Sequence, residues 1–373
     1  MGLSMTQGSG LNVLGGVDVP STDDLRRLSE LAGPCVTLYL PSTPFGPGTR
    51  SGPSRLHHLA NEAATALQAD GTGPEVAEEI LAPFRRLEQD PAFWQHQGEG
   101  LALFAAPGFF EGFRLAATVS ERVAVGAAFR LLPLVAQGGV DTIFFILALS
   151  QNSVRLLKGN AHTVSELAVP GLPTAMEGAL PEAEPDRVRG VHSVGALGSI
   201  AHGQGTEADY DKRALDRYFR AVDDAVVAGL RGRRDPLVLA CVDYYVPTYR
   251  AVSRYPAIWE AAVVGSPERR SSQELHDAAW SVVAPHFTKE AAHEAARYRE
   301  AAGTGRTATG AQAVLAAARD GKVGTLLLAV EAASSEDEVL EQAVVETVRR
   351  SGRVLTVDAD AALGSVVAAV LRY

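Results

Sequence analysis

The sequence predicts an α/β protein of three domains, and three observations carry this prediction. The chain has 373 residues, against about 150 for a typical domain, and 46% of them are hydrophobic, which is enough for several cores. Short apolar runs of strand length alternate with stretches whose apolar residues recur at helical spacing. Changes in this pattern place an N-terminal mixed α/β domain over 1–135, a middle domain over 136–270 and a C-terminal α/β sandwich over 271–373.

In the N-terminal domain, a helix is expected after the cap-like sequence Ser21-Thr-Asp-Asp24. A buried strand follows at Cys35–Leu40, and then about fifteen residues rich in Gly, Pro and Ser that we expect to be a loop. The aromatic pair Phe93 and Trp94 is expected to cover the core. Further helices and strands are predicted over 56–67, 76–87 with a kink at Pro83, 101–104, 113–119 and 123–131.

The middle domain is expected to begin with a strand buried on both faces, over 141–149, because its apolar run is continuous. Strands over 154–157 and 162–167 come next, then a loop over 190–206. A capping box at Thr206 to Asp209 opens a long helix, and a second buried strand is predicted over 236–242. In the C-terminal domain, helices and strands alternate over 275–283, 291–301, 311–319, 325–330, 339–348 and 353–357.

The loop contains the polar tetrad His202-Gly203-Gln204-Gly205 in the stretch VHSVGALGSIAHGQGTEADY. Glycine permits backbone angles that other residues resist, so this segment can be approached closely by a partner. On spacing alone, a surface connection before a capped helix is the simpler interpretation. A phosphate-binding loop is not indicated, because no G-x-x-x-x-G-K-[ST] occurs.

Charge and composition restrict the partners. The formal net charge of −10 disfavours a generally basic, RNA-coated surface but is compatible with a local basic patch. Arg231, Arg233 and Arg234 form such a cluster and could contact the phosphates of rRNA or tRNA. The two cysteines, Cys35 and Cys241, are far apart and are expected to be buried in a reducing cytoplasm. No secretory signal or membrane span is indicated, and no metal site or cofactor is predicted.

The chain resembles the bacterial branch of the archaeo-eukaryotic class I release factor and Pelota superfamily. The resemblance rests on TGRTATGAQAVLAAARDGKVGTLLLAVE and SGRVLTVDADAALGSVVAAVLRY near the C-terminus, on the glycine-rich loop and long helix in the middle, and on VTLYLPSTPFGPG and FWQHQGEGLALF. It implies a release-factor-like middle domain and an L7Ae-like α/β sandwich at the C-terminus.

In release factors of this superfamily, a Gly-Gly-Gln loop enters the peptidyl-transferase centre and promotes hydrolysis of peptidyl-tRNA. The matching residues here are His202, Gly203 and Gln204, so the first glycine is replaced by histidine. A backbone amide beside the glutamine can stabilise an oxyanion, and the side-chain amide can position water. His202 offers a group for proton transfer.

Two classes of function follow from the resemblance. The first is a cytoplasmic ribosome A-site factor that releases or rescues peptidyl-tRNA through Gln204 and Gly203, with a translational GTPase as a further partner and no membrane or DNA partner. The second is a ribosome-binding stress or hibernation factor without catalysis. A third reading, a stand-alone ester hydrolase, also stays open.

Overall fold

The computed structural model describes residues 17–43, 51–179, 207–330, 332, 335, 337–357 and 363–373. These residues form three β-sheets and the helices packed on them, so the predicted α/β class is confirmed. The chain divides into two compact units. The first unit comprises Met1–Ile143, Gly159–Ser165 and Ala284–Tyr373, and the second comprises Phe144–Lys158 and Glu166–Val283.

The first sheet of the first unit has the strand order β3-β2-β1-β4. Its strands are antiparallel, with Leu38 of β1 opposite Leu103 of β2 and Val123 of β4. Successive side chains of a strand point to opposite faces, so each strand feeds two cores. The four strands are β1 (Cys35–Pro41), β2 (Gly100–Ala106), β3 (Phe109–Leu115) and β4 (Arg122–Gly126).

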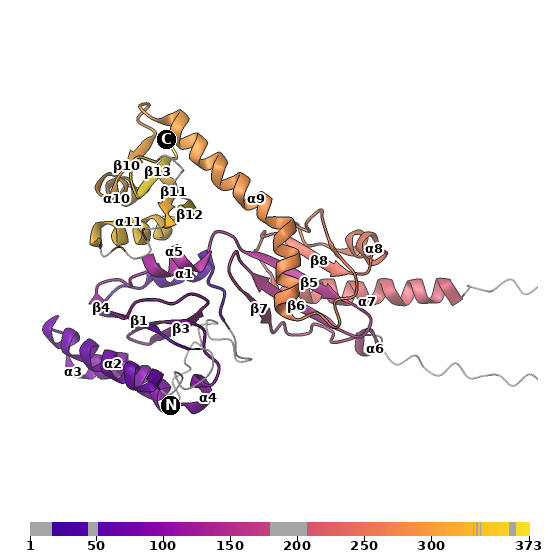
Figure 1. Cartoon of the computed structure of the whole chain (residues 1–373), viewed down its shortest axis with the longest axis horizontal. Helices are drawn as coiled ribbons and strands as arrows, with labels where there is room; N and C mark the ends of the chain where they lie inside the picture. Colours follow the sequence, from indigo (N-terminus) through magenta and orange to yellow (C-terminus); the bar gives the residue numbers. More distant parts are fainter. Residues whose placement is uncertain are drawn as a thin grey trace, which may run out of the picture. The chain divides into compact units, whose positions relative to one another are not determined.

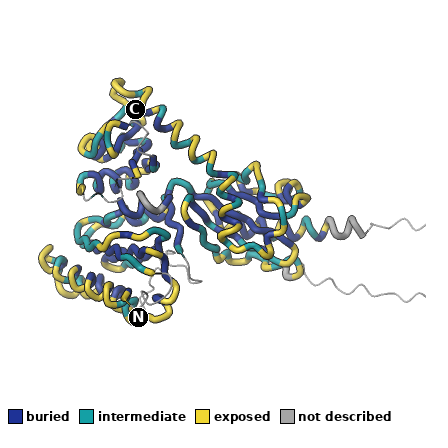
Figure 2. Tube along the Cα trace, viewed as in Figure 1, coloured by how far each residue is buried: buried dark blue, intermediate teal, exposed yellow. Residues whose placement is uncertain are grey.

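Helices cover both faces of this sheet (Figure 1). On one face, Leu38 and Leu103 pack against α2 (Ser51–Ala69), α3 (Pro74–Glu88) and the short α4 (Pro91–Trp94). On the other face, Tyr39 and Phe104 pack against α1 (Thr22–Glu30) and α5 (Leu132–Gly138). β1 and β2 are buried almost throughout, whereas all five residues of β4 are half-buried, and Figure 2 shows this burial along the chain.

The second sheet of this unit has the order β10-β13-β11-β12. Leu326 and Leu328 of β11 face α10 and α11, whereas Leu327 faces Tyr298 on the last part of α9. The strands are β10 (Thr307–Thr309), β11 (Val323–Ala329), β12 (Arg353–Val357) and β13 (Val367–Leu371), and the helices are α9 (Ser272–Ala301), α10 (Ala311–Arg319) and α11 (Glu338–Arg349).

The two sheets of the first unit share one core, because α1 and α5 meet α11 in the layer between them. Leu25 and Leu28 of α1 and Leu340 and Val344 of α11 belong to the same buried cluster. Polar groups reinforce this contact: Arg349 Nε donates to the carbonyl oxygen of Ser29 at 2.7 Å. The first unit thus contains most of the N-terminal and C-terminal domains predicted from the sequence.

Glu341 of α11 makes a deeply buried polar contact in this layer. Its carboxylate accepts hydrogen bonds from the backbone N–H groups of Leu131 and Leu132, at the start of α5. Glu341 is 4% exposed, and this burial raises its pKa to about 7. Arg130 and Arg122 oppose the shift without cancelling it.

The sheet of the second unit has the order β7-β6-β5-β8-β9, and β5, β8 and β9 are parallel. All six residues of β5 are buried, as the continuous apolar run predicted. Phe144 of β5 lies 5.8 Å, between ring centroids, from both His276 and Trp280 on the first part of α9. The strands are β5 (Phe144–Leu149), β6 (Val154–Gly159), β7 (Val164–Leu167), β8 (Leu237–Cys241) and β9 (Val263–Val264), and the helices are α6 (Met176–Ala179), α7 (Glu207–Gly229) and α8 (Tyr245–Val252).

Several predicted elements are confirmed, including the capped helix α1, where Ser21 N and Oγ both donate to Asp24 Oδ2 at 2.8 and 2.6 Å. Cys35 and Cys241 are buried and unpaired, as expected. Burial raises the pKa of the Cys35 thiol to about 11 and that of Cys241 to about 12, so both stay protonated at neutral pH. Within the described ranges, no helix is long and apolar enough to cross a membrane.

Other boundaries differ from the prediction. Helix α2 begins at Ser51 inside the segment expected to be loop, because Pro53 is tolerated in a first turn and Gly52 leaves room for Trp94, whose ring would lie 2.3 Å from an added Cβ. The strand predicted over 123–131 ends at Gly126. The two helices expected on either side of Pro285 are one helix, α9, whose halves are buried in different units.

The raised pKa of Glu341 predicts how stability depends on pH. Folding favours its protonated form, so the stabilisation is complete below the unfolded-state pKa of about 4.3 and is lost as the pH rises through about 7. The loss is on the order of 3 kcal/mol. We expect Glu341→Gln, which keeps an acceptor for Leu131 and Leu132, to flatten the pH dependence of urea unfolding between about pH 5 and pH 8.

The matched control is Glu338→Gln on the same helix, where the side chain is 66% exposed. This variant should leave the pH dependence of the wild-type protein unchanged. An equal flattening by both substitutions would show that the effect does not come from the buried carboxyl group.

Candidate nucleic-acid interface

The residues predicted to be catalytic, His202, Gly203 and Gln204, lie outside the described residues, as does the loop assigned to 190–206. The elements on either side of that segment are described. Helix α6 ends at Ala179, and α7 begins at Glu207. The described part of the candidate site therefore consists of α6, α7 and the contacts that attach them to the second unit.

Both flanks are attached to the end of β5. The backbone N–H of Met176, the first residue of α6, donates to the carbonyl oxygen of Gln151 at 2.7 Å. On the other side, the Tyr218 hydroxyl of α7 donates to the carbonyl oxygen of Ser150 at 2.5 Å. Burial raises the pKa of Tyr218 well above its usual value, so this hydroxyl keeps its proton. Two consecutive residues that directly follow the buried strand β5 thus anchor α6 on one side and α7 on the other.

Helix α7 extends beyond this anchor. Glu207 and Tyr218 lie 11 residues apart, which corresponds to about 16 Å of helix. Figure 1 shows α7 extending past the edge of the sheet of its unit. The predicted loop therefore joins α7 at the far end of a supported helix.

An aromatic cluster packs the described part of α7 against α8. The ring of Phe219 lies 5.0 Å from Tyr245 and 5.7 Å from Tyr249, and both pairs have edge-to-face geometry. Such pairs contribute about 0.5–1.5 kcal/mol each beyond the area that they bury. Next to them, Tyr244 is 61% exposed and packs its ring on Tyr245 at 4.6 Å.

A buried carboxylate, Asp223, completes the attachment of α7. It is 1% exposed and accepts hydrogen bonds from Ser253 Oγ at 2.5 Å and from the backbone N–H of Arg254 at 2.9 Å. The Tyr249 hydroxyl is a third, longer donor at 3.4 Å. A buried carboxylate with several donors is satisfied only in one arrangement of its neighbours, so Asp223 sets the position of α7 against the end of α8.

The solvent face of α7 carries Arg213, Arg217 and Arg220, which we call the α7 ridge. All three are exposed, and the spacings of four and three residues place them on one side of the helix. Within the ranges that the structure describes, none of the three guanidinium groups pairs with a carboxylate. Guanidinium groups in this state can bind phosphate oxygens.

Of the three arginines predicted to contact RNA, the structure leaves two available. Arg231 and Arg234 are exposed in the turn after α7. Arg233 instead donates from Nε to Asp235 at 2.8 Å, and its guanidinium lies 5.5 Å from the centroid of the Phe145 ring. Its contacts are those of a structural residue.

Sequence reasoning missed the α7 ridge. The helix was recognised from its apolar positions, and the arginines occupy the opposite face at the same period. The same helical periodicity that marks the apolar face also marks the arginine face, so the sequence contained the signal for both. Among the described residues, no three His, Cys, Asp or Glu side chains are grouped closely enough to hold a metal ion.

The described part of the second unit thus consists of a sheet whose central strand, β5, is followed by two anchoring residues, and of a helix, α7, that extends past the sheet. The segment 180–206, which carries His202-Gly203-Gln204, lies between α6 and α7 in the sequence. Residues 143–322 match the profile of the family described as bacterial archaeo-eukaryotic release factor family 3. This part of the chain, just under half of its length, is therefore similar to a release-factor family, in line with the resemblance noted from the sequence.

Solved structures with weaker likeness include the archaeal translation termination factor aRF1, which is 16% identical over 95% of this chain and 99% of that one, with a TM-score of 0.25. A ribosome-bound archaeal Pelota, in a model with ABCE1, is 14% identical over 72% of this chain and 73% of that one, with a TM-score of 0.37. Dom34 of S. cerevisiae is 11% identical over 74% of each chain, with a TM-score of 0.35. No curated protein sequence matches the chain.

The Asp223 contacts predict a large loss of stability on truncation. Asp223→Ala leaves the Ser253 hydroxyl and the Arg254 N–H without their acceptor, and we expect unfolding to become easier by about 2–3 kcal/mol. Urea unfolding followed by tryptophan fluorescence reports on this unit through Trp259 and Trp280. The control is Asp224→Ala, which removes a neighbouring carboxylate that is 68% exposed and should change stability by less than about 0.5 kcal/mol. Equal effects of the two changes would contradict the anchoring role.

Proposed function

We propose that this protein is a cytoplasmic factor that binds the ribosomal A site and promotes release or rescue of peptidyl-tRNA. The observation that carries the proposal is the match of residues 143–322 to a release-factor family. In the sequence, His202-Gly203-Gln204 lies within this range, between α6 and α7, and both helices are anchored next to the end of β5. A reactive segment has to reach a target inside a large RNA assembly. A helix that is fixed at one end and extends past its domain supports that requirement.

In this proposal, Gln204 and Gly203 act together at the scissile ester. The Gln204 side chain positions the attacking water, and the neighbouring backbone amide stabilises the oxyanion that develops at the carbonyl carbon. His202 is available for proton transfer to or from the reacting oxygens. Neither amide group needs a shifted pKa for this chemistry.

Ribosome binding is assigned to phosphate contacts by the α7 ridge and by Arg231 and Arg234. Such contacts position a protein on RNA without reading its sequence. Their restriction to one helix face and the following turn explains how a chain with a net charge of −10 could approach RNA in one orientation. By the resemblance to the superfamily, we also propose a translational GTPase as a protein partner.

The second candidate is a ribosome-binding stress or hibernation factor without catalysis. One observation favours it: the first glycine of the Gly-Gly-Gln pattern is His202 here. A residue with a side chain restricts the backbone at that position, compared with glycine. Under this candidate, the same anchors present the segment for binding to RNA or tRNA only.

The decisive change is Gln204→Ala. We expect this variant to bind 70S ribosomes that carry peptidyl-tRNA as the wild type does, but to lose release of the labelled peptide, because the group that positions the water is absent. The matched control is Gln68→Ala, at an exposed position on α2. Ribosome binding without release by the wild type would favour the hibernation candidate. Failure of the wild type to bind ribosomes, empty or loaded, would refute both.

The α7 ridge predicts the salt dependence of this binding. Replacing Arg213, Arg217 and Arg220 with alanine should weaken co-sedimentation with ribosomes. It should also lower the slope of the logarithm of affinity against the logarithm of salt by about 2, because each phosphate contact contributes about 0.7–0.9. The control replaces Arg26, Arg55 and Arg85, whose side chains are 41%, 43% and 50% exposed and pair with acids in the first unit. An equal slope change in both triple variants would mean that the net charge of the protein, and not the position of the α7 ridge, determines ribosome binding.

A further inference from the structure

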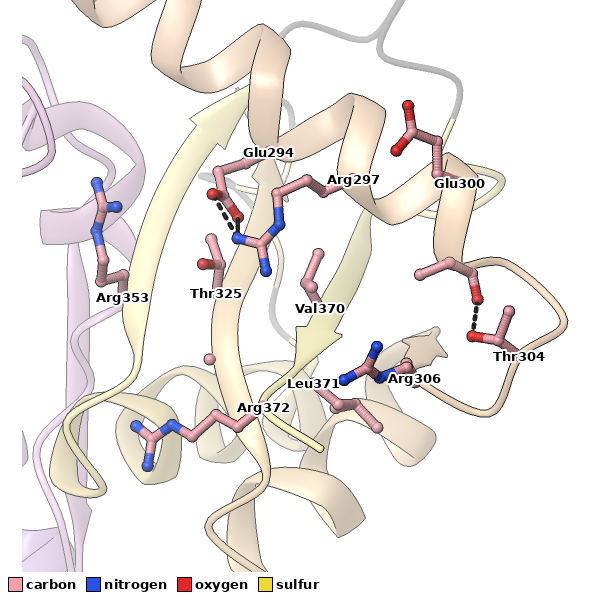
Figure 3. A pocket seen from close by; sticks show the side chains of 12 residues that line it. Glu294, Arg297, Glu300, Thr304, Arg306, Thr325, Arg353, Val370, Leu371 and Arg372 are labelled. Atoms are coloured by element: carbon pink, nitrogen blue, oxygen red, sulfur yellow. Dashed lines mark hydrogen bonds and ion pairs between the residues drawn. The ribbon is translucent and has the colours of Figure 1, made fainter.

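A groove of about 560 Å³ lies at one end of the second sheet of the first unit. Gln204 belongs to a different unit and is distant from the groove residues in the sequence. Figure 3 shows its side chains, which come from the last turns of α9, the residue before β10, the starts of β11 and β12 and the end of β13. The groove is therefore made where five segments of the C-terminal part of the chain meet.

Four arginines line this groove: Arg297, Arg306, Arg353 and Arg372. We call it the arginine groove. Two acids also line it, Glu294 and Glu300, so arginines exceed acids by two. This excess stands out in a protein whose net charge is −10. Arginines from four separate segments converge only if the folded chain brings them together, so this cluster is not visible in the sequence.

Three of these arginines are held in place by neighbours. Arg297 Nη1 donates to both carboxylate oxygens of Glu294, at 2.7 and 3.0 Å, and Glu294 is 6% exposed. Arg353 Nη2 donates to Glu290 at 2.6 Å. Arg372 Nη2 donates to two backbone carbonyl oxygens at 2.9 and 3.0 Å. A guanidinium has five donors, so each of the three retains N–H groups for a ligand.

Arg306 differs from the other three. It is exposed at the turn before β10, and its side chain forms no ion pair or hydrogen bond with any residue in the described ranges. Replacing it breaks no side-chain hydrogen bond or ion pair within the described part of the chain. It is therefore the cleanest position for a test.

A β-bulge shapes the floor of the groove. Val323 lies opposite Leu371 and Thr325 opposite Val370, which leaves Gly324 as the extra residue of β11. A Cβ on Gly324 would lie 3.3 Å from Cγ of Arg372 and 3.3 Å from the carbonyl oxygen of Val370. Because Gly324 has no side chain, the aliphatic part of Arg372 can lie beside β11.

The lining indicates the class of ligand. It contains no aromatic side chain among the described residues, and its apolar members are Ala301, Val370 and Leu371. Small-molecule pockets are mostly apolar and enclosed, and protein-docking sites depend on buried aromatic or large apolar anchors. An open, arginine-lined groove instead suits the phosphodiester backbone, which is bound through charge and hydrogen bonds at successive phosphates.

We propose that the arginine groove is a second RNA-binding site, which holds the phosphate backbone of an RNA strand without base recognition. Arg297, Arg353 and Arg372 supply oriented guanidinium groups. Arg306 lies on the opposite side of β13 and would contact the same RNA strand from there. The site is independent of the chemistry of Gln204 and of the α7 ridge. It does not require that the protein release peptidyl-tRNA.

The test uses the full-length protein and a fluorescein-labelled oligouridylate, with binding measured by anisotropy from about 50 to about 200 mM KCl. We expect the double variant Arg306→Ala/Arg353→Ala to bind more weakly. Its slope against the logarithm of salt should fall by about 1.4, because a single-strand contact contributes about 0.7. Arg319→Ala combined with Arg85→Ala removes two exposed arginines outside the groove and should leave the slope unchanged.

Two further variants separate folding from binding. Arg306→Glu, which breaks no side-chain hydrogen bond or ion pair of the described residues, should weaken binding even if the double variant does not fold. Arg306→Lys/Arg353→Lys keeps the charges and should restore most of the salt slope. Gln204→Ala should bind the oligonucleotide as the wild type does, so loss of release activity does not bear on this result.

The proposal fails if wild-type protein does not bind the oligonucleotide at the lowest salt, or if the groove and control variants lose the same slope. It also fails if polyglutamate binds in an Arg306-dependent manner while the oligonucleotide does not, which would assign the groove to an acidic protein segment. A slope change confined to the groove variants supports it.

Discussion

The end of β5 is the constraint on which the middle of this chain depends. Ser150 and Gln151 are consecutive, and their carbonyl oxygens accept from the α7 and α6 sides respectively. Because the strand before them is buried throughout, it cannot shift without opening the core of the unit. The core therefore positions Met176 at the start of α6 and Tyr218 in the middle of α7.

The first unit depends on contacts between distant parts of the sequence. Arg349 bonds to Ser29 across 320 residues, and Glu341 reaches Leu131 across 210. Closing loops of this length is entropically costly before the contacts form, so this layer is expected to assemble late. During synthesis, the N-terminal sheet has to wait for α11 before the face that contains Tyr39 and Phe104 is fully covered.

Local patterns predicted the strands and helices that bury one clear face or a continuous run. The capping pair Ser21 and Asp24 and the apolar run of β5 are examples, and both are found where expected. The edge strand β10 and the inner strand β13 were not predicted, because their short stretches, TAT and VAAVL, carry weak periodicity. They are set by pairing, since β13 pairs with β11 and β10 pairs with β13. The joining of α9 across Pro285 was also missed, since a proline normally ends a helix and only tertiary burial of both halves overrides this.

The same limit applies to the candidate sites. His202, Gly203 and Gln204 could be proposed from sequence because they are contiguous and resemble a known loop. The arginine groove could not, because its members come from separate segments and converge through strand pairing and a bulge at Gly324.

Charge organisation connects the two proposed RNA contacts. The chain has 44 acidic and 34 basic residues, so most of its surface repels a polyanion. The exposed arginines of the α7 ridge and of the arginine groove are local concentrations of positive charge on this mostly acidic chain. The acidic remainder disfavours other orientations, because like charges near phosphate cost free energy. In the RNA complex proposed above, the negative charge elsewhere on the chain would therefore favour the orientation in which these arginines face the phosphates.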